Sequence, residues 1–498
     1  MLPTKKYKYV CGAWLLTLGL LSSCGEEFLA ESPTDQVTDA NFYKTATDAI
    51  QATNAVYGEL ITAGQYNAAL WGVGDIFSDL SNTGGGGGGD GIEYQQLDNF
   101  NIPTTNPVVN RLWGSCYVGI GRANIVLQKV PAMSIDPALQ KRCLGEAQFL
   151  RAKYYFDLVR AYGDVPLLTT PPATLAEVNV PRTPAAQVYA QIEKDLTDAI
   201  GNLPPSYSGD DIGRATKWAA TGLLAKVYLT ENKMTEAGQR AREVISGSGK
   251  ALWDNYADNF KVANENGKES LFEAQFISGR NQYTQDGPGF SGNEFFGPRG
   301  QGIVPQGGYG FNIPEPDFVA GYEAGDLRRD ATIWKPGDVY PDGRTQPASL
   351  PGSPNGYGVK KWFIGKANTN IWDSELNIPV LRLAEMYLIQ AEAEGPTATG
   401  LEAINKVRRR AFGLPINTAS AKDIAAGISA AAFKTAVIRE RKYELAFEMD
   451  RWFDMKRTGT LLTSPQLIAK GIKPFNVVLP IPQTERDLNP NLAQNPGY

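Results

Sequence analysis

Histidine is absent from the 498 residues of this chain. Its absence excludes Ser-His-Asp and Cys-His catalysis, HExxH zinc sites and the usual acid–base chemistry of imidazole. Glycoside hydrolysis by paired carboxylates needs no histidine and stays open, but no local pattern singles out an acid and a nucleophile.

Cysteine is scarce, with four residues. Two of them, Cys116 and Cys143, lie in segments with helical periodicity. If these segments form an antiparallel pair that turns near Pro131, Cys116 lies about 21 Å from the turn and Cys143 about 10 Å. The unequal heights favour two buried thiols, with a disulfide as the alternative.

Long apolar runs are missing beyond Leu21, so no transmembrane helix is expected there. The composition is otherwise that of a globular protein, 42% hydrophobic and 20% charged. Without the three lysines of the first 23 residues, 45 basic residues face 53 acidic ones, a net charge of −8. This acidic balance disfavours nucleic acids and polyanions as partners, although a local patch could override it.

The first 23 residues have the order of a secretory signal peptide, with Lys5, Lys6 and Lys8 before a short apolar run, Val10–Leu21. The next stretch, Leu21-Ser22-Ser23-Cys24, resembles the lipobox of bacterial lipoproteins, and Gly25-Glu26-Glu27 resembles the surface-export signal of Bacteroidetes lipoproteins. We therefore expect 1–23 to be removed, Cys24 to be acylated, and the protein to face outward from the outer membrane. An ordinary cleavage site beside a chance cysteine is the alternative.

Helical periodicity dominates much of the chain. The clearest segment is Asp136–Tyr162, where Asp136 can cap the helix and Pro137 fits its first turn. Apolar residues then recur at steps of three and four, which predicts one buried stripe. Further helices are expected over 39–64, 108–130, 184–203, 220–228, 234–244, 380–394, 400–411 and 431–457. Paired helices of this size predict a mostly α, tetratricopeptide-like α-solenoid, although no clean repeat consensus is present.

Loop-rich stretches interrupt this pattern. Glycine, proline, asparagine and aromatic residues crowd together, and the periodicity disappears. Because helices return afterwards, residues 24–498 are predicted to form one intertwined body rather than separate domains. Its helical scaffold is expected over about 39–71, 107–248 and 378–460, and its irregular excursions over about 72–106, 249–377 and 461–498.

Short motifs are spread along the whole of 24–498. They are Phe28-Leu29 with Pro33, Thr38 and Phe42-Tyr43; Phe149-Leu150-Arg151-Ala152 through Tyr162-Gly163-Asp164-Val165-Pro166-Leu167; Gly213-Arg214-Ala215-Thr216; Leu381-Arg382-Leu383-Ala384-Glu385; Arg439-Glu440-Arg441 with Glu444-Leu445-Ala446-Phe447-Glu448; Arg451-Trp452-Phe453-Asp454-Met455-Lys456-Arg457; and Leu479-Pro480-Ile481-Pro482 with Asn489-Pro490-Asn491. In this order, the set resembles the SusD/RagB family of outer-membrane nutrient-binding lipoproteins.

The resemblance implies a mostly helical fold in which four tetratricopeptide-like helix pairs support an irregular ligand face. It also implies a partner, a TonB-dependent barrel transporter of the SusC kind, over which such a protein forms a lid. Members of the family capture an oligosaccharide or a peptide and pass it to the pore, and they are not enzymes.

A sugar site needs a flat aromatic platform for the C–H face of the ring and polar groups for its hydroxyls. Aromatic residues in loops are better candidates than those on helical stripes, and the family's ligand face comes from the same two excursions. The candidates are Trp71, Tyr94, Asn101, Tyr283, Phe290, Phe295, Tyr309 and Trp334. Packing within the loops is the alternative for each, and Trp113, Trp218 and Trp452 are expected in the helical core.

Six consecutive glycines, Gly84–Gly89, lack the GK[ST] ending of a phosphate loop. They either let the backbone approach a flat ligand or form a mobile loop. Asp79, Asp90 and Glu93 nearby could hold calcium, but their spacing does not match an EF-hand. No metal site or cofactor is assigned.

Two charged patterns suggest structural roles. The basic run Lys406–Arg410 is predicted to be a solvated helix face, with a transporter or lipid headgroups as alternative contacts. Three i,i+3 pairs, Arg441 with Glu444, Glu448 with Arg451 and Asp454 with Arg457, predict a helix lined by salt bridges.

The sequence thus predicts a surface lipoprotein that binds oligosaccharides by stacking and hydrogen bonding and delivers them to a SusC-like transporter without making or breaking a bond. Three alternatives stay open: a peptide-binding member of the same family, a lipid-anchored glycoside hydrolase, and a mainly structural member with little affinity of its own.

Overall fold

The structure is a computed structural model that describes residues 42–280, 284–367 and 370–498. The predicted signal peptide and Cys24 lie outside the described residues. The described part is mostly helical with a few short strands, which confirms the predicted fold class. No helix in the described ranges is long and apolar enough to cross a membrane.

The scaffold consists of the longer helices. These are α2 (Ala46–Tyr57), α5 (Pro107–Lys129), α6 (Pro137–Tyr162), α8 (Ala185–Asn202), α9 (Lys217–Thr230), α10 (Met234–Gly247), α14 (Leu383–Glu394), α15 (Ala398–Ala411) and α16 (Ala430–Glu444). Helix α6 begins as the sequence predicts: the side chain of Asp136 accepts hydrogen bonds from the backbone N–H groups of Ala138 and Leu139, and Pro137 occupies the first turn.

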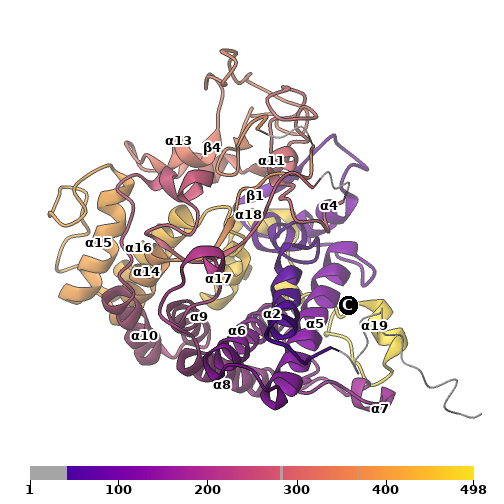
Figure 1. The fold of residues 1–498 in the computed structure, drawn as a ribbon. Coiled ribbons are helices and arrows are strands. Elements are labelled where there is room, and N and C mark those ends of the chain that lie inside the picture. The colour runs from indigo at the N-terminus through magenta and orange to yellow at the C-terminus, as the bar shows by residue number, and fades with distance from the viewer. Residues whose placement is uncertain (1–41, 281–283, 368–369) are drawn as a thin grey trace, which may run out of the picture.

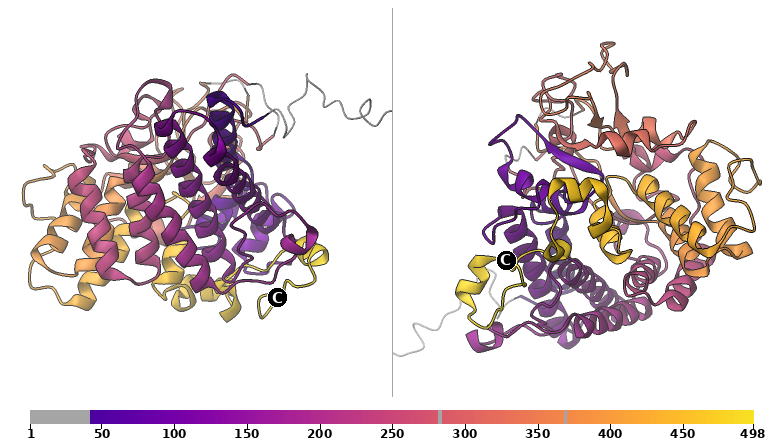
Figure 2. Two further views of the ribbon diagram at one scale, coloured as in Figure 1. Left: turned by 60° about the horizontal axis from the view of Figure 1, so that its bottom comes forward. Right: turned by 180° about the vertical axis from the view of Figure 1, so that it is seen from behind.

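The scaffold helices form a curved row. Helix α5 packs on α6, α6 on α8, α8 on α9, α9 on α10, α10 on α14, and α14 on α15. Figure 1 shows this row bending around the lower part of the molecule, and the left view of Figure 2 shows the purple and magenta helices side by side. Cys116 and Cys143 are buried and free inside it, which confirms the prediction of two thiols.

The chain leaves the scaffold after α10 and returns at α14. The two ends of this excursion are joined, because β2 (Ser270–Ala274) pairs antiparallel with β6 (Ile378–Arg382) across a register shift. The strand replaces the first turn of the helix that was predicted over 380–394. Other short strands pair β1 (Ser81–Gly84) with β3 (Phe311–Pro314), and β4 (Ile333–Trp334) with β5 (Gly358–Val359).

Short helical elements fill the remaining segments. They are α3 (Ala69–Trp71), the π-helix η3 (Gly72–Ile76), α4 (Ile92–Asp98), α7 (Leu175–Val178), α11 (Gly292–Phe295), α12 (Pro316–Ala320), α13 (Arg328–Thr332), α17 (Arg451–Arg457), α18 (Pro465–Lys470) and α19 (Gln483–Leu488), with 3-10 turns η2 (Gly58–Ile61), η4 (Val130–Ala132), η5 (Gly209–Asp211), η6 (Tyr256–Phe260), η7 (Val262–Asn264), η8 (Leu461–Thr463) and η9 (Pro474–Val477). Seen from behind, α17 and α18 lie inside the curve of the scaffold, whereas α19, beside the C-terminus, lies at its outer edge (Figure 2, right).

The helix predicted over 431–457 is wrong in its middle. Helix α16 ends at Glu444, and Phe447 and Met449 then adopt left-handed backbone conformations, with φ of 60° and 64°, before α17 begins. Of the three expected i,i+3 pairs, the structure forms the one between Asp454 and Arg457, at 2.7 Å. Arg441 and Glu448 instead reach partners far along the chain.

The basic run on α15 is not a solvated face, so that prediction is also wrong. Arg408, Arg409 and Arg410 are buried, and each pairs with carboxylates from other segments. The periodicity of one helix could not predict the burial of these arginines, because their acidic partners lie elsewhere in the sequence.

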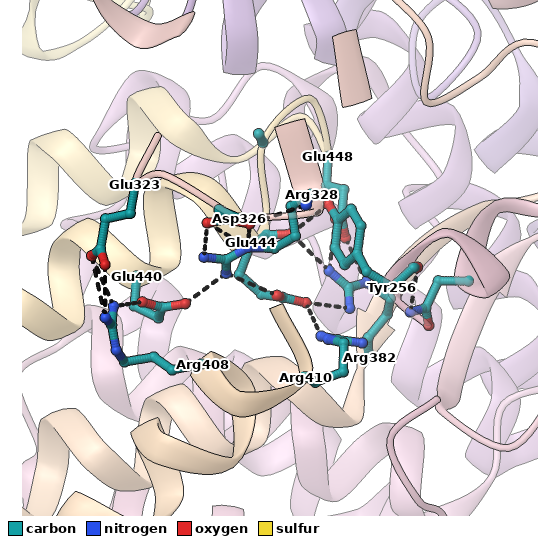
Figure 3. A network of polar contacts seen from close by, with 12 residues as sticks. Tyr256, Glu323, Asp326, Arg328, Arg382, Arg408, Arg410, Glu440, Glu444 and Glu448 are labelled. Carbon is teal, nitrogen blue, oxygen red and sulfur yellow. Dashed lines mark hydrogen bonds and ion pairs between the residues drawn. The ribbon is translucent and has the colours of Figure 1, made fainter. Parts of the chain in front are cut away.

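Glu444 is the centre of a buried ion-pair network (Figure 3). Guanidinium nitrogens of Arg410, Arg382 and Arg328 lie 2.5, 2.9 and 3.2 Å from its carboxylate oxygens. These three arginines come from α15, β6 and α13, so one carboxylate joins the returning scaffold to the excursion. Arg382 also pairs with Glu448 at 2.7 Å, and Arg410 with Glu269 at 3.1 Å.

Burial by itself would raise the pKa of Glu444, but Arg410, Arg382 and Arg328 outweigh burial and lower the pKa to about 2. An acid whose pKa is lower in the folded state stabilises the fold above its unfolded pKa. That contribution is lost as the pH falls from about 4.5 through about 2.

We expect Glu444→Gln to lower the free energy of unfolding by about 3–5 kcal/mol at pH 7, because three buried guanidinium groups lose their shared counter-ion. Urea denaturation measures the loss. The control is Asp198→Asn, which breaks an exposed pair with Lys194 and should cost under about 0.5 kcal/mol. Equal effects of the two substitutions would contradict a special role for the buried network.

Candidate ligand-binding site

Three half-buried aromatic side chains meet on the loop-rich side of the molecule: Phe295, Tyr309 and Trp372. Phe295 lies at the centre, with its ring centroid 5.3 Å from that of Tyr309 and 5.5 Å from that of Trp372. Phe295 ends α11, whereas the other two residues come from loops. We call this group the aromatic shelf.

The shelf rests on a buried aromatic layer. The ring of Phe295 stacks on Phe311 at 5.7 Å, and Phe311 contacts Tyr94 at 6.0 Å. Tyr94 stacks in turn on Trp71, with centroids 4.2 Å apart and planes 20° from parallel. Because each ring is held by the next, the shelf is fixed before any ligand arrives.

Backbone pairing brings the glycine run to the shelf. Gly84 at the end of β1 lies opposite Phe311 at the start of β3, and the exposed residues Gly86–Gly89 follow. Asp90 fixes the base of this loop, because its carboxylate accepts a hydrogen bond from the backbone N–H of Gly86 at 2.6 Å and pairs with Arg299 at 3.0 Å. Gly87 and Gly89 have φ of 102° and 93°, which favours glycine, and a Cβ added at either would meet nothing within 4 Å.

Two charged side chains hold the loop that carries Tyr309. The buried carboxylate of Glu294 accepts hydrogen bonds from the backbone N–H groups of Gln306 and Gly308, and Arg299 donates to the carbonyl of Tyr309 at 2.7 Å. Burial raises the pKa of Glu294, although the hydrogen bonds from these amides oppose the shift. Sequence reasoning did not single out Glu294 or Arg299, since most of their partners in this loop are backbone groups, which carry no sequence signal.

The structure separates the predicted aromatic candidates into two groups. Phe295 and Tyr309 belong to the shelf, whereas Trp71, Tyr94, Phe290 and Trp334 are buried. Trp71 and Tyr94 support the shelf from below. Trp334 instead forms the centre of a small separate cluster with Ile303, Val304 and Tyr340.

Two of the predicted candidates, Asn101 and Tyr283, belong to neither group. Asn101 is exposed on the loop before α5, with no ring contact to the shelf, and Tyr283 lies outside the described residues. Trp372 was missed by sequence reasoning. Its position in the second excursion was the available signal, because it lies in an irregular stretch with no helical stripe to bury it.

Two of the three acidic residues considered for calcium, Asp79 and Asp90, have other partners. Asp79 pairs with Arg451 at 2.7 Å and with Lys442 at 2.8 Å, and Asp90 pairs with Arg299. The described part of the chain holds no group of three or more His, Cys, Asp or Glu side chains placed to hold a metal ion.

The described chain is a helical scaffold that carries a half-buried aromatic platform on its loops. Two family models match the chain: "SusD family" over residues 268–498, and "Starch-binding associating with outer membrane" over residues 90–229. SusD-like protein P25 of Formosa agariphila is 31% identical, and the match covers 96% of this chain and 97% of that protein. The chain therefore belongs to the SusD/RagB family.

Solved structures agree with this assignment. A laminarin binding SusD-like protein superposes with a TM-score of 0.80 at 33% identity, covering 92% of this chain and all of that one. Surface glycan-binding protein A from Bacteroides fluxus gives a TM-score of 0.78 at 25% identity, covering 91% of this chain and 100% of that one.

The buried carboxyl group of Asp75 connects the aromatic layer beneath the shelf to the segment between α16 and α17. Asp75 lies in η3, directly after Trp71, and accepts hydrogen bonds from the side chain of Asn312 in β3 and from the backbone N–H of Met449. Burial raises the pKa of Asp75 to about 7, although both hydrogen bonds oppose the shift.

We expect the pH dependence of stability to change in Asp75→Asn. A carboxyl group with a raised folded pKa stabilises the fold below about pH 4, and this contribution is lost as the pH rises through about 7. Relative to Asp75→Asn, the wild type should lose on the order of 1.4 kcal/mol of unfolding free energy per pH unit within that window. Urea denaturation from pH 4 to 8 measures this, and parallel curves for the two proteins would contradict it.

Proposed function

We propose that this protein is a cell-surface lipoprotein that binds oligosaccharides at the aromatic shelf and delivers them to a TonB-dependent transporter of the SusC kind. In this proposal no bond is made or broken. The shelf takes the C–H face of a sugar ring, and the groups around it hydrogen-bond the hydroxyls.

The observation that carries the proposal is the chemistry of the shelf. Phe295, Tyr309 and Trp372 offer partly exposed, preorganised rings, and the ordering cost of binding is therefore small. The exposed glycine loop beside them leaves room for a broad, flat ligand to reach the backbone. An open site made of stacking and hydrogen bonds gives modest affinity, on the order of micromolar to millimolar, which suits a protein that must release its ligand.

The relatives support the choice of ligand. A solved relative at 33% identity is described as laminarin binding, and the second family model is described as starch-binding. We therefore take laminarin oligosaccharides as the first ligands to test. Membership of the family supports delivery to a transporter, as does the second family model, which is described as associating with the outer membrane.

We expect Trp372→Ala to weaken binding of laminarihexaose at least about tenfold, because it removes one stacking face of the shelf. Isothermal titration calorimetry with residues 25–498 measures the change. The control is Trp253→Ala: Trp253 is also half-buried, but it packs against Lys268 and makes no ring contact with the shelf. Equal losses in the two variants would show that the shelf is not the site.

The same titration separates the proposal from its rivals. Binding of peptides but not of oligosaccharides would assign the peptide-binding role, and new reducing ends after incubation would assign a glycoside hydrolase. Absence of binding to every oligosaccharide and peptide tested would leave a structural role in transporter assembly.

We expect Cys24→Ala to abolish acylation, since the thiol is the proposed site of lipid attachment. In cells given a labelled fatty acid, the wild type should carry the label and partition with the outer membrane. The variant should be unlabelled and recovered in the soluble fraction. A variant that still carries the label would contradict the assignment of Cys24.

A further inference from the structure

A hollow lies on the helical scaffold, and none of the three shelf residues lines it. It has a volume of about 140 Å³ and lies between the loop that precedes α9, the start of α9, and the segment that leads from α10 into β2. A cavity of about 150 Å³ holds benzene, so this hollow is large enough for one six-membered ring.

The walls of the hollow combine an aromatic face with polar groups. Trp218, which the helical pattern placed in the core, is half-buried and lines it together with Tyr207, Asn266 and Ser248. The hydroxyl oxygen of Tyr207 is buried and has no hydrogen-bond partner among the described residues. An indole beside hydroxyl and amide groups is the combination that suits a sugar ring.

One ammonium group in the wall of the hollow, that of Lys250, gives it a positive charge, and that of Lys217 lies outside the lining residues. Lys217 lies over the ring of Trp218, with its nitrogen 4.3 Å from the centroid, and Lys250 lines the wall. Lys250 donates to the backbone carbonyl of Gly267 at 2.8 Å. In the described ranges neither lysine has a carboxylate within ion-pair distance. Burial lowers the pKa of Lys250, although the negative charge of Glu273 opposes the shift.

The other charged residue in the wall does not attract a ligand in the same way. Arg214 is already paired, with Glu146 at 2.9 Å and with Asp211 at 2.6 Å. Glu273 lies behind Lys250 and accepts hydrogen bonds from the backbone N–H of Asn266 and the side chain of Asn377. Lys250 therefore remains the cation of the wall that is available to a bound anion.

We infer that this hollow is a second carbohydrate site, which binds a single sugar residue that carries a carboxylate, such as a uronate. The ring lies against Trp218, its hydroxyls meet the side chain of Ser248, and its carboxylate meets Lys250. The site is independent of the aromatic shelf, so either proposal can fail without the other.

Calorimetry with glucuronate, glucose and cyclohexanecarboxylate tests this inference on residues 25–498. Glucose lacks the charge, and cyclohexanecarboxylate keeps the ring and the charge but lacks the hydroxyls. We expect glucuronate to bind at least about fivefold more tightly than either, with saturation at concentrations on the order of 10 mM or below. Binding of glucose or cyclohexanecarboxylate as tight as that of glucuronate overturns the inference, as does the absence of glucuronate binding.

Variants locate the site. We expect Lys250→Gln and Trp218→Ala each to weaken glucuronate binding about tenfold, because they remove the cation and the stacking face. Lys268→Gln is the matched control, since its ammonium lies over Trp253 outside the hollow, and it should bind as the wild type does. Trp372→Ala should also leave glucuronate binding unchanged. If glucuronate binding is lost in Trp372→Ala but kept in Lys250→Gln, the ligand is bound at the shelf and the second site is refuted. Circular dichroism checks that each variant is folded.

Discussion

The interaction on which the structure depends is the buried carboxylate of Glu444 with its three arginines. Burying these charges costs several kcal/mol of desolvation per ion, so the network adds little net stability compared with apolar packing. Its effect on the fold comes from the free-energy cost of leaving any one of these buried charges without a partner. Only an arrangement that brings α13, β6 and α15 together around the end of α16 satisfies all of the charges. The network therefore fixes the position of the long, irregular excursion on the helical scaffold.

This constraint reaches the candidate site through a short chain of contacts. Arg382 bonds both Glu444 and Glu448, and the left-handed turn around Glu448 directs the backbone N–H of Met449 to Asp75. Asp75 holds Asn312, which follows Phe311 in β3. Phe311 in turn supports Phe295. The position of the shelf is thus set by polar contacts deep in the protein, although its own surface is aromatic.

Local sequence signals predicted the elements that depend on neighbouring residues and failed where distant residues decide. The cap of α6 follows from Asp136 and Pro137, and the structure confirms it, but from Phe149 to Tyr162 the helix is buried on every side and not along one stripe only. The break between α16 and α17 depends on Phe447 and Met449, which adopt left-handed conformations without being glycines. The arginines of α15 were predicted to be solvated because their partners, such as Glu269 and Glu444, lie far away in the sequence.

The aromatic candidates show the same limit in the site itself. The sequence predicted loop aromatics as a group, but it could not tell Phe295 from Phe290, five residues earlier, which is buried. Exposure is decided by which rings pack beneath which, and some of those contacts join residues more than 200 positions apart, such as the tilted pair of Trp71 and Phe295. Burying Trp71 and Tyr94 is what makes the exposed rings rigid, and rigid rings lose little entropy when a ligand stacks on them. Trp71 and Tyr94 therefore support the candidate site from positions where they cannot touch a ligand.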